Sequence, residues 1–318
     1  MANKNLINRR DFLSTMSAAG ISIPLLNLFP AKLTAEEKKS RPDICIFSKH
    51  LQFLPDYASM AEVAAEIGFD GVDLTVRPGG HVLPENVEND LPLAATAINK
   101  AGLKVPMMVT GITGADEPYA ELTLKTAHEL GIKFYRMGYF SYDEKIGVQR
   151  SLEQIKTKIA GLIELNKKYR INGAYQNHSG DGVGAPVWDL WWLLKEFDPR
   201  WIGSQYDIRH ASVEGAYSWP LAMELLRPYI KTTAIKDFFW IKEKNKWKIH
   251  NCPLGDGMVD FSTYFQLYKQ AGISGPISLH IEYDVYTDND TLDAKQKKTI
   301  LAMKKDLETL RRWLGKYD

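Results

Sequence analysis

The sequence predicts a single-domain α/β protein built as a closed (β/α)8 TIM barrel. Short apolar segments alternate with longer amphipathic ones about every thirty residues, and eight such units can be counted. No linker interrupts them, as a closed parallel barrel requires. A doubly wound open sheet is the alternative, but the first apolar segment, Asp43–Ser48, runs into Lys49 and His50 and not into a glycine-rich phosphate loop.

The composition is that of a globular protein. The chain has 318 residues, of which 45% are hydrophobic and 25% charged. Lys and Arg (40) nearly balance Asp and Glu (39), so no basic field exists to attract nucleic acid. We therefore expect one large domain and no nucleic-acid partner.

Residues 1–40 are expected to be a leader, with the barrel spanning residues 41–318. The segment Arg9–Leu13 (Arg-Arg-Asp-Phe-Leu) precedes the apolar run Ser17–Phe29, a pattern that resembles a twin-arginine export signal. The run is short and broken by Pro24, which argues against a membrane span. We expect the export machinery as a partner and a periplasmic location. The alternative is an uncleaved amphipathic leader.

The predicted strands and helices follow one another in strict alternation. The strands are expected at Asp43–Ser48, Gly71–Val76, Lys104–Val109, Lys133–Gly138, Asn172–Asn177, Ile202–Asp207, Lys231–Lys236 and Ile277–Glu282. Helices are expected at Tyr57–Ile67, Pro118–Leu130, Val148–Tyr169, Val187–Phe197 and Phe261–Ala271, several of them ending at a glycine. A long charged helix, roughly Thr291–Leu314, would close the ring.

Polar side chains gather at the carboxyl ends of the later strands. In a parallel barrel these ends face one cavity, so residues from successive strands are brought together there. His280 and Glu282 are two residues apart and so share a face. The predicted site comprises Gln176, His178, Asp207, His210, Lys236, His280 and Glu282. Of these, His210 and His280 are expected to bind substrate.

Two further strand ends supply arginines. In the loop after the second strand, Pro78 and a glycine pair predict a tight turn that holds Arg77 and His81 in place. Arg136 ends the fourth strand. Arginine suits a cluster of sugar hydroxyls, a carboxylate or a phosphate. We expect all three residues to bind substrate, although a plain loop with a surface arginine is the simpler alternative.

Tryptophans are concentrated in the second half of the chain. Trp240, just past the seventh strand, is expected to bind substrate at the pocket rim. Trp188, Trp191 and Trp192 have helical spacing and are expected to pack an outer helix against the barrel. Residues 241–247 are rich in lysine and predict a solvated loop or hairpin.

At these residues the sequence resembles the xylose isomerase-like barrel superfamily, which contains sugar isomerases and epimerases as well as abasic-site endonucleases. The resemblance extends from about Asp43 to the end of the chain. It is carried by Phe69-Asp-Gly-Val-Asp-Leu74, Gln176-Asn-His178, Asp207-Ile-Arg-His210, Ala234-Ile-Lys-Asp237, Leu254-Gly-Asp-Gly-Met-Val-Asp260 and Glu282.

The resemblance implies a divalent metal site, but this sequence departs from the family's usual set of metal ligands. Members usually bind the metal through a strand-five Glu, a strand-six Asp, a strand-seven His and a strand-eight Glu. Here Gln176 and Ala234 replace two of the four ligands. A Mn, Mg or Zn ion held by Gln176, Asp207 and Glu282 remains one possibility, with His210 or His280 as a substitute ligand. No nucleotide cofactor is expected.

The same departure bears on the reaction that the resemblance implies. Related epimerases use two glutamates to remove and return a proton next to a carbonyl, and Gln176 cannot take a proton. Glu282 and His178 would then be the proton carriers, and Lys236 would stabilise the enediolate. Alternatively, Lys236 only pairs with Glu282 and His178 only donates to a carbonyl.

Three functions therefore stay open, each with a small-molecule carbohydrate as ligand. The first is an exported sugar isomerase or epimerase-like enzyme acting on an unphosphorylated sugar. The second is a lyase or hydratase acting on 3-keto glycosides, which needs only one base and one acid. The third is a non-catalytic sugar-binding barrel. The sequence does not predict the oligomeric state.

Overall fold

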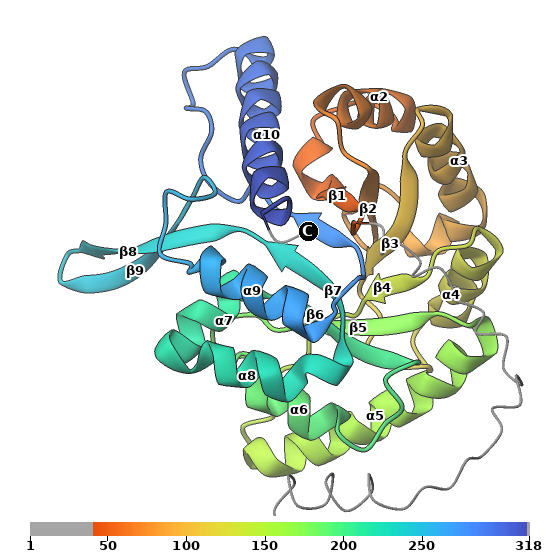
Figure 1. The fold of residues 1–318 in the computed structure, drawn as a ribbon. Helices are drawn as coiled ribbons and strands as arrows, with labels where there is room; N and C mark the ends of the chain where they lie inside the picture. The colour runs from red at the N-terminus through yellow and green to blue at the C-terminus, as the bar shows by residue number, and fades with distance from the viewer. Residues whose placement is uncertain (1–40, 317–318) are drawn as a thin grey trace, which may run out of the picture. The chain divides into compact units, whose positions relative to one another are not determined.

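A computed structural model describes residues 41–316 of the protein, so the predicted leader lies outside the described residues. Eight parallel strands close into a barrel in the order β1-β10-β7-β6-β5-β4-β3-β2, surrounded by helices (Figure 1). The predicted (β/α)8 barrel is confirmed.

Each of the eight predicted strands is present. The barrel strands are β1 (Ile44–Phe47), β2 (Gly71–Val76), β3 (Lys104–Thr110), β4 (Phe134–Arg136), β5 (Asn172–Gln176), β6 (Ile202–Asp207), β7 (Ile230–Ile235) and β10 (Ile277–Leu279). The register places Asp207 opposite Ala234 and Ala234 opposite Ser278. The polar strand ends of β5, β6, β7 and β10 therefore form one continuous arc.

The predicted helices are also present. The α-helices are α2 (Tyr57–Ile67), α3 (Val87–Lys100), α4 (Ala120–Glu129), α5 (Gly147–Tyr169), α6 (Val187–Leu194), α7 (Ile208–Gly215), α8 (Trp219–Leu226), α9 (Phe261–Ala271) and α10 (Leu292–Leu314). Short 3-10 turns lie at Ser48–Leu51, Pro84–Asn86, Ala216–Ser218 and Arg227–Tyr229. Among the described helices, none is both long and apolar enough to cross a membrane.

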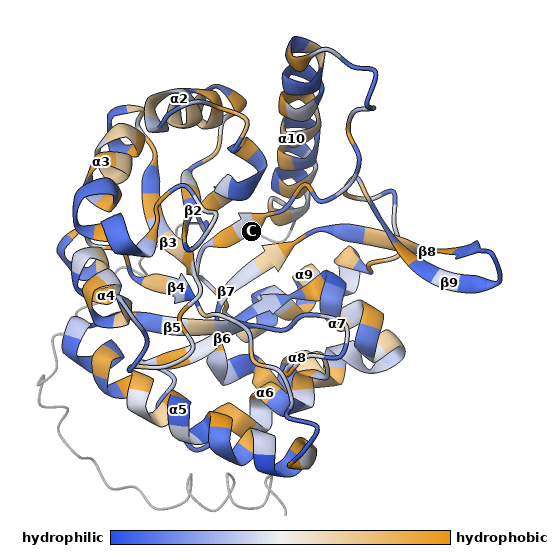
Figure 2. Cartoon of the chain, turned by 180° about the vertical axis from the view of Figure 1, so that it is seen from behind, coloured by the Kyte–Doolittle hydropathy of each residue, from blue (hydrophilic) through white to orange (hydrophobic). Residues whose placement is uncertain are grey.

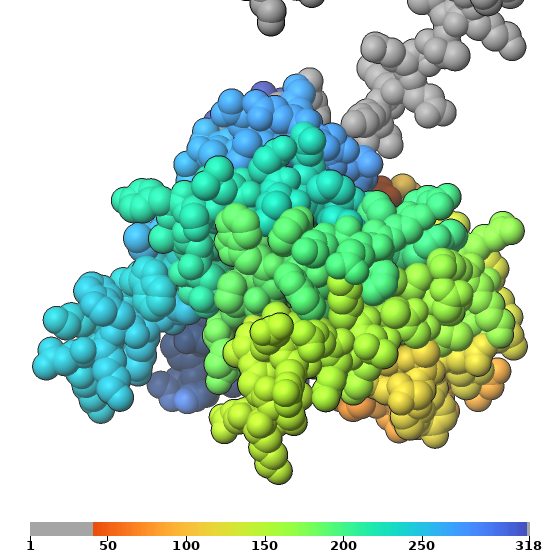
Figure 3. Space-filling model, turned by 90° about the horizontal axis from the view of Figure 1, so that it is seen from below, coloured from red at the N-terminus to blue at the C-terminus, as the bar shows by residue number. Residues whose placement is uncertain are grey.

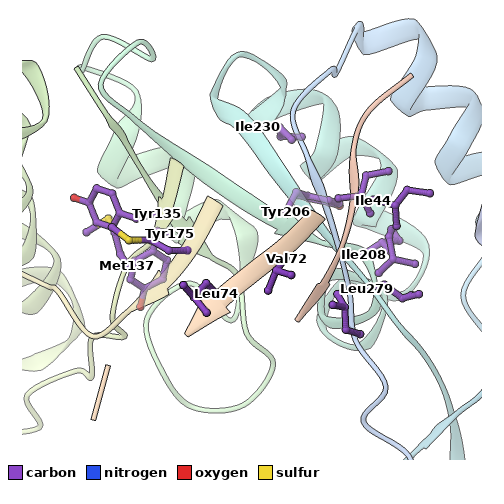
Figure 4. Close-up of a cluster of buried hydrophobic side chains, with 14 of the residues drawn as sticks. Ile44, Val72, Leu74, Tyr135, Met137, Tyr175, Tyr206, Ile208, Ile230 and Leu279 are labelled. Atoms are coloured by element: carbon purple, nitrogen blue, oxygen red, sulfur yellow. The ribbon is translucent and has the colours of Figure 1, made fainter. Parts of the chain in front are cut away.

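The two faces of each strand have different roles. On β2, Val72 and Leu74 belong to the hydrophobic core, part of which Figure 4 shows. The alternating residues Asp73 and Thr75 are completely buried but do not belong to it. Successive strand side chains point to opposite faces, so the polar residues point into the barrel. The barrel interior is thus available for chemistry while the outer layer supplies stability.

A β-hairpin interrupts the alternation between β7 and α9. Its strands, β8 (Asp237–Glu243) and β9 (Lys246–Cys252), are antiparallel and form a separate two-stranded sheet. Lys244 and Asn245 turn the chain with φ of 48° and 63°, as a two-residue hairpin turn requires. The hairpin extends away from the barrel as an arm (Figures 1 and 3) with a hydrophilic tip (Figure 2). The predicted loop or hairpin is therefore a hairpin, longer than residues 241–247.

One packing prediction is wrong in part. Trp191 and Trp192 are partly buried and pack against the core, as expected. Trp188 is 50% exposed. Helix α6 is apolar on more positions than its buried face can cover, so helical spacing alone did not identify which indole faces solvent.

Candidate active site

Asp207 ends β6 and also begins α7. Its Oδ1 accepts a hydrogen bond of 3.1 Å from the backbone N–H of His210, which makes it the N-cap of that helix. The side chain is completely buried. This double role fixes the carboxylate at the mouth of the barrel with Oδ2 directed at its neighbours.

Lys236 lies between two carboxylates. Its Nζ is 2.8 Å from Glu282 Oε2 and 3.4 Å from Asp207 Oδ2. The lysine side chain is 3% exposed, Asp207 is 0% exposed and Glu282 is 25% exposed. The site therefore has a buried positive charge shared by two negative ones, reached by solvent on the Glu282 side.

The charges in this arrangement shift the pKa of both carboxyl groups. Burial alone would raise the pKa of Asp207, but Lys236 and the hydrogen bond from the backbone N–H of His210 outweigh it and lower the pKa to about 2. Burial likewise opposes ionisation of Glu282, yet Lys236 and His280 hold its pKa well below the ordinary value. Both groups are carboxylates at neutral pH.

Gln176, at the end of β5, is hydrogen-bonded through both ends of its amide. Its Oε1 accepts from Arg136 Nη1 at 3.0 Å and from the Tyr139 hydroxyl at 2.5 Å. Its Nε2 donates to Asp207 Oδ2 at 2.8 Å. The amide thus links Arg136 to Asp207 and orients both. The neighbouring Asn177 exchanges two further hydrogen bonds with the Asp207 backbone, at 2.8 and 2.9 Å.

His210 is held as a neutral imidazole. Its Nδ1 accepts from the Ser179 backbone N–H at 3.1 Å and lies 2.8 Å from Arg209 Nη1. The ring proton is therefore on Nε2, which faces Asp207 Oδ2 at 3.6 Å. Burial lowers the pKa of His210 well below its ordinary value.

His178 is the one histidine of the arc that is exposed. Its ring lies 4.0 Å from the ring of His210, and its Nδ1 is 3.0 Å from the Ser179 carbonyl oxygen. A proton on Nδ1 satisfies that carbonyl and leaves the Nε2 lone pair available. Burial of part of the ring, with Lys236 nearby, lowers the pKa of His178. The ring is therefore a neutral base at neutral pH.

His280 connects the arc to the barrel interior. It stacks on Phe47 with ring centroids 4.5 Å apart, and its Nδ1 is 3.6 Å from Glu282 Oε1. Its Nε2 is 3.1 Å from Ser278 Oγ, which donates to Asp73 Oδ2 at 2.6 Å. Burial lowers the pKa of His280 and raises that of Asp73 to about 6.

The residue after Lys236 has a structural role. The Asp237 carboxylate accepts backbone N–H groups from Phe238, Gly255, Gly257 and Val259 at 2.8 to 3.2 Å. This explains why a Lys-Asp pair and a Gly-Asp-Gly turn occur in the same sequence. The aspartate shapes the loop that returns from the hairpin, while the lysine faces the site.

The predicted substrate-binding residues are not all at the arc. Arg136 joins it through Gln176, and the guanidinium carbons of Arg77 and Arg136 lie 5.9 and 5.8 Å from the Phe47 ring centre. His81 instead bonds the Thr75 hydroxyl through Nδ1, at 3.0 Å.

The loop that carries Arg77 is the tight turn expected. The backbone N–H of Gly80 donates to the Arg77 carbonyl at 2.8 Å, and Gly79 has a φ of 68°. Trp240 lies on β8, out on the hairpin, with its ring against Phe238.

Several site residues escaped the sequence reasoning. Tyr139 follows β4 by three residues and bonds Gln176. Arg209 Nη2 donates to Asn251 Oδ1 at 2.6 Å, and Asn251 Nδ2 donates to the Glu282 carbonyl at 2.9 Å. Arg209 stands inside the Asp-Ile-Arg-His motif and could have been found there. Asn251 could not, since only the hairpin brings it back to the site.

A divalent metal does not fit the three expected ligands as they are arranged. The oxygen of Gln176 already accepts two hydrogen bonds, and Lys236 lies between Asp207 and Glu282, where a cation would bind them. Ala234 offers no ligand. In the part of the chain from 41 to 316, no group of three His, Cys, Asp or Glu has metal-binding geometry. The central cation of this site is the Lys236 ammonium.

Solved structures show the same fold at low sequence identity. A 3-keto-D-glucoside 4-epimerase from E. coli matches with a TM-score of 0.61 at 15% identity, covering 82% of this chain and 99% of that one. D-psicose 3-epimerase from Clostridium cellulolyticum H10 matches at 0.65 and 12%, covering 86% and 99%. The probable 3-DHS dehydratase of petrobactin synthesis from Bacillus anthracis matches at 0.63 and 15%, covering 85% and 98%.

The family assignment is independent of these structures. No curated protein matches the chain at a significant level. Residues 61–313 match the family described as xylose isomerase-like TIM barrel, which includes β2 to β10 and every residue of the arc. The chain therefore belongs to the xylose isomerase-like TIM barrel family.

Proposed function

We propose that the protein is a carbohydrate isomerase or epimerase-like enzyme that removes a proton from a carbon next to a carbonyl group. The observation that carries the proposal is the buried pair of Lys236 Nζ and Glu282 Oε2, 2.8 Å apart. A carboxylate and an ammonium side by side supply the base and the oxyanion stabiliser that enolisation needs.

The pair also explains how a weakly basic carboxylate becomes an effective base. In the free enzyme Lys236 stabilises the ionised form of Glu282 and lowers its pKa. A carbonyl oxygen that accepts a hydrogen bond from Lys236 takes part of that stabilisation away. Glu282 then gains basicity at the moment when the adjacent carbon acid is polarised, and Lys236 stabilises the negative charge of the developing enediolate.

His178 is the proposed second proton carrier. It lies at the β5 end of the arc, whereas Glu282 lies at the β10 end, with β6 and β7 between them. The free Nε2 of His178 can donate or accept a proton without disturbing its bond to Ser179. The names of two similar structures, a psicose 3-epimerase and a keto-glucoside epimerase, agree with a sugar substrate.

Hydrogen exchange from solvent tests the isomerase proposal. The protein is incubated in D₂O with a panel of neutral ketoses, aldoses and 3-keto glycosides, and the sugars are followed by NMR. Deuterium is expected at the carbon next to the carbonyl, and Glu282→Gln should abolish it while Lys248→Met, at an exposed ion pair, should not. Absence of exchange across the whole panel would refute the proposal.

A lyase acting on 3-keto glycosides is the second candidate. The amide of Gln176, held at both ends by hydrogen bonds, favours it, since Glu282 is then the one carboxylate of the arc that solvent reaches. Glu282 would take the proton from C2, and the C–H electrons would form the C1–C2 double bond. His178 would first take a proton from solvent on Nε2 and would then pass it to the aglycone as the aglycone leaves C1. The C3 carbonyl oxygen would accept a hydrogen bond from Lys236 Nζ.

The two reactions give different products. A 3-keto glycoside with a chromogenic aglycone should release that aglycone and an enone under the lyase reaction, but only an exchanged or epimerised glycoside under the isomerase reaction. Sugar binding without exchange or elimination would leave the binding-protein alternative.

Export is a separate proposal. We propose that residues 1–40 direct the chain through the twin-arginine pathway to the periplasm, on the evidence of Arg9, Arg10 and the apolar run that follows. Replacing both arginines by lysine should shift the protein from the periplasmic to the cytoplasmic fraction. An unchanged distribution contradicts the proposal.

A further inference from the structure

One face of the β8–β9 hairpin carries apolar side chains that the proposed reaction does not use. Residues directly opposite in an antiparallel pair share a face, and Trp240 is opposite Ile249 while Trp247 is opposite Lys242. Trp240 and Trp247 are 38% and 64% exposed. Together with Met258, which is 61% exposed, they line an open hollow of about 620 Å³.

The other face of the hairpin carries charged side chains together with two partly buried apolar ones, Phe239 and Ile241. Lys248 Nζ is 2.7 Å from Glu243 Oε2, and His250 and Lys246 are exposed on the same side. A solubilising hairpin would not need two large exposed indoles on one face only. The asymmetry indicates that the apolar face meets something.

The apolar face begins at the candidate active site. Asn251 and Phe238 are opposite one another at its base. Asn251 bonds the Glu282 carbonyl at 2.9 Å, and the Arg209 guanidinium lies 5.5 Å from the Phe238 ring centre. Phe238 in turn meets Trp240 edge to face, with centroids 6.2 Å apart. The apolar face of the hairpin therefore leads outward from Glu282, the proposed catalytic base.

Strand geometry gives the reach of this row. At about 3.3 Å per residue, Trp240 lies about 7 Å and Trp247 about 13 Å along the hairpin from Phe238 and Asn251. A group attached to a sugar at Glu282 would have to extend along the hairpin by these distances to contact the two indoles. Three exposed apolar side chains are far fewer than the roughly 20–30 residues per side of a stable protein interface. A ring-sized ligand fits better than a second copy of the chain.

We propose that Trp240, Trp247 and Met258 bind the aglycone ring of a glycoside whose sugar unit lies at Glu282. The inference rests on the proposed function and narrows its substrate class from free sugars to glycosides with an aromatic or otherwise apolar aglycone. Indole faces stack on flat apolar rings and the methionine thioether adapts to their edges.

Paired probes of different length test the subsite. Binding of 4-nitrophenyl and methyl D-glucopyranosides, both anomers of each, is measured by titration calorimetry and ligand-observed NMR with the full chain. The aryl glycoside is expected to bind at least tenfold more tightly than the methyl glycoside. Trp247→Ala and Trp240→Ala should remove most of this preference, and Trp247→Phe should keep part of it. Trp188→Ala, at an exposed tryptophan on α6, is the matched control and should change nothing.

Each other outcome overturns the subsite. The proposed subsite is contradicted if both probes bind with equal affinity or if neither binds. It is also contradicted if the hairpin variants lose the same affinity for the methyl glycoside as for the aryl glycoside. A dimer, seen by sedimentation, that Trp247→Ala dissociates without changing the aryl preference contradicts it as well. If the aryl preference is present but neither exchange nor elimination occurs, only the proposed catalytic function fails. If methyl glucoside binds with no aryl preference, only the subsite fails.

Discussion

Replacing Lys236 by methionine is expected to destabilise the fold strongly, because it leaves one buried and one partly buried carboxylate without their cation. At an effective dielectric constant of about 20, separations of 2.8 Å to Glu282 and 3.4 Å to Asp207 correspond to gross attractions of about 6 and about 5 kcal/mol. The desolvation of the three groups offsets much of this. Removing one partner of a buried pair typically costs about 3–5 kcal/mol net.

The expected loss depends on pH in a defined direction. In the native protein the pKa values of Asp207 and Glu282 are lowered, so their contribution is complete above the unfolded values of about 4 and is lost as pH falls through the native ones. Without Lys236, burial raises both pKa values. The variant then regains stability by taking up protons as pH falls, and its deficit should be smaller at pH 5 than at pH 8.

Urea unfolding followed by circular dichroism at both pH values measures the deficit. Lys248→Met is the control, because its pair with Glu243 is exposed and worth about 1 kcal/mol or less. Two outcomes would show that the lysine is not the counter-ion of the two carboxylates. One is a loss of unfolding free energy in Lys236→Met no larger than that of the control. The other is a loss that does not change between pH 8 and pH 5.

Three further results are expected. The raised pKa of Asp73, about 6, means that the folded protein binds the proton more tightly than the unfolded chain, so native stability should fall as pH rises from 4 to 7. Asp73→Asn should remove up to about 3 kcal/mol of this fall, and parallel pH–stability curves for the two proteins would contradict the cause. Gly275→Ala should lower the urea concentration at which the barrel unfolds, because a Cβ there would lie 1.6 Å from the Lys231 carbonyl oxygen. Gly161→Ala, in open space on α5, should instead raise the free energy of unfolding by about 0.5–1 kcal/mol. Treatment with a chelator should leave both the melting temperature and the activity unchanged, since Lys236 supplies the positive charge of the site. Calorimetry, elemental analysis and the exchange assay check this. A stoichiometric metal whose removal lowers the melting temperature would refute it.

Elements encoded by a few neighbouring residues could be predicted well from the sequence. Helix α2 has the predicted ends, because Asp56 caps its first turn through Ser59 and Gly68 ends it with a φ of 103°. Helix α9 does so as well, between Asp260 and Gly272. The residues predicted at the strand ends lie close together in the structure, because barrel closure brings any carboxyl-terminal strand ends together.

What these side chains do to one another was decided by tertiary structure. Lys236 and Glu282 are 46 positions apart, and only the pairing of β7 with β10 sets their distance. The same holds for Gln176, whose two ends are engaged by groups from other strands. Local sequence could not indicate that Trp188 faces solvent.

The sequence by itself determined the barrel, its strand ends and the residue types available there, since alternation, caps and turns are written within short segments. Only the tertiary structure decided that a lysine occupies the centre of the arc and that the hairpin extends two indoles away from it. Register and closure set distances between residues far apart in the chain, and the charge balance of a buried site depends on those distances.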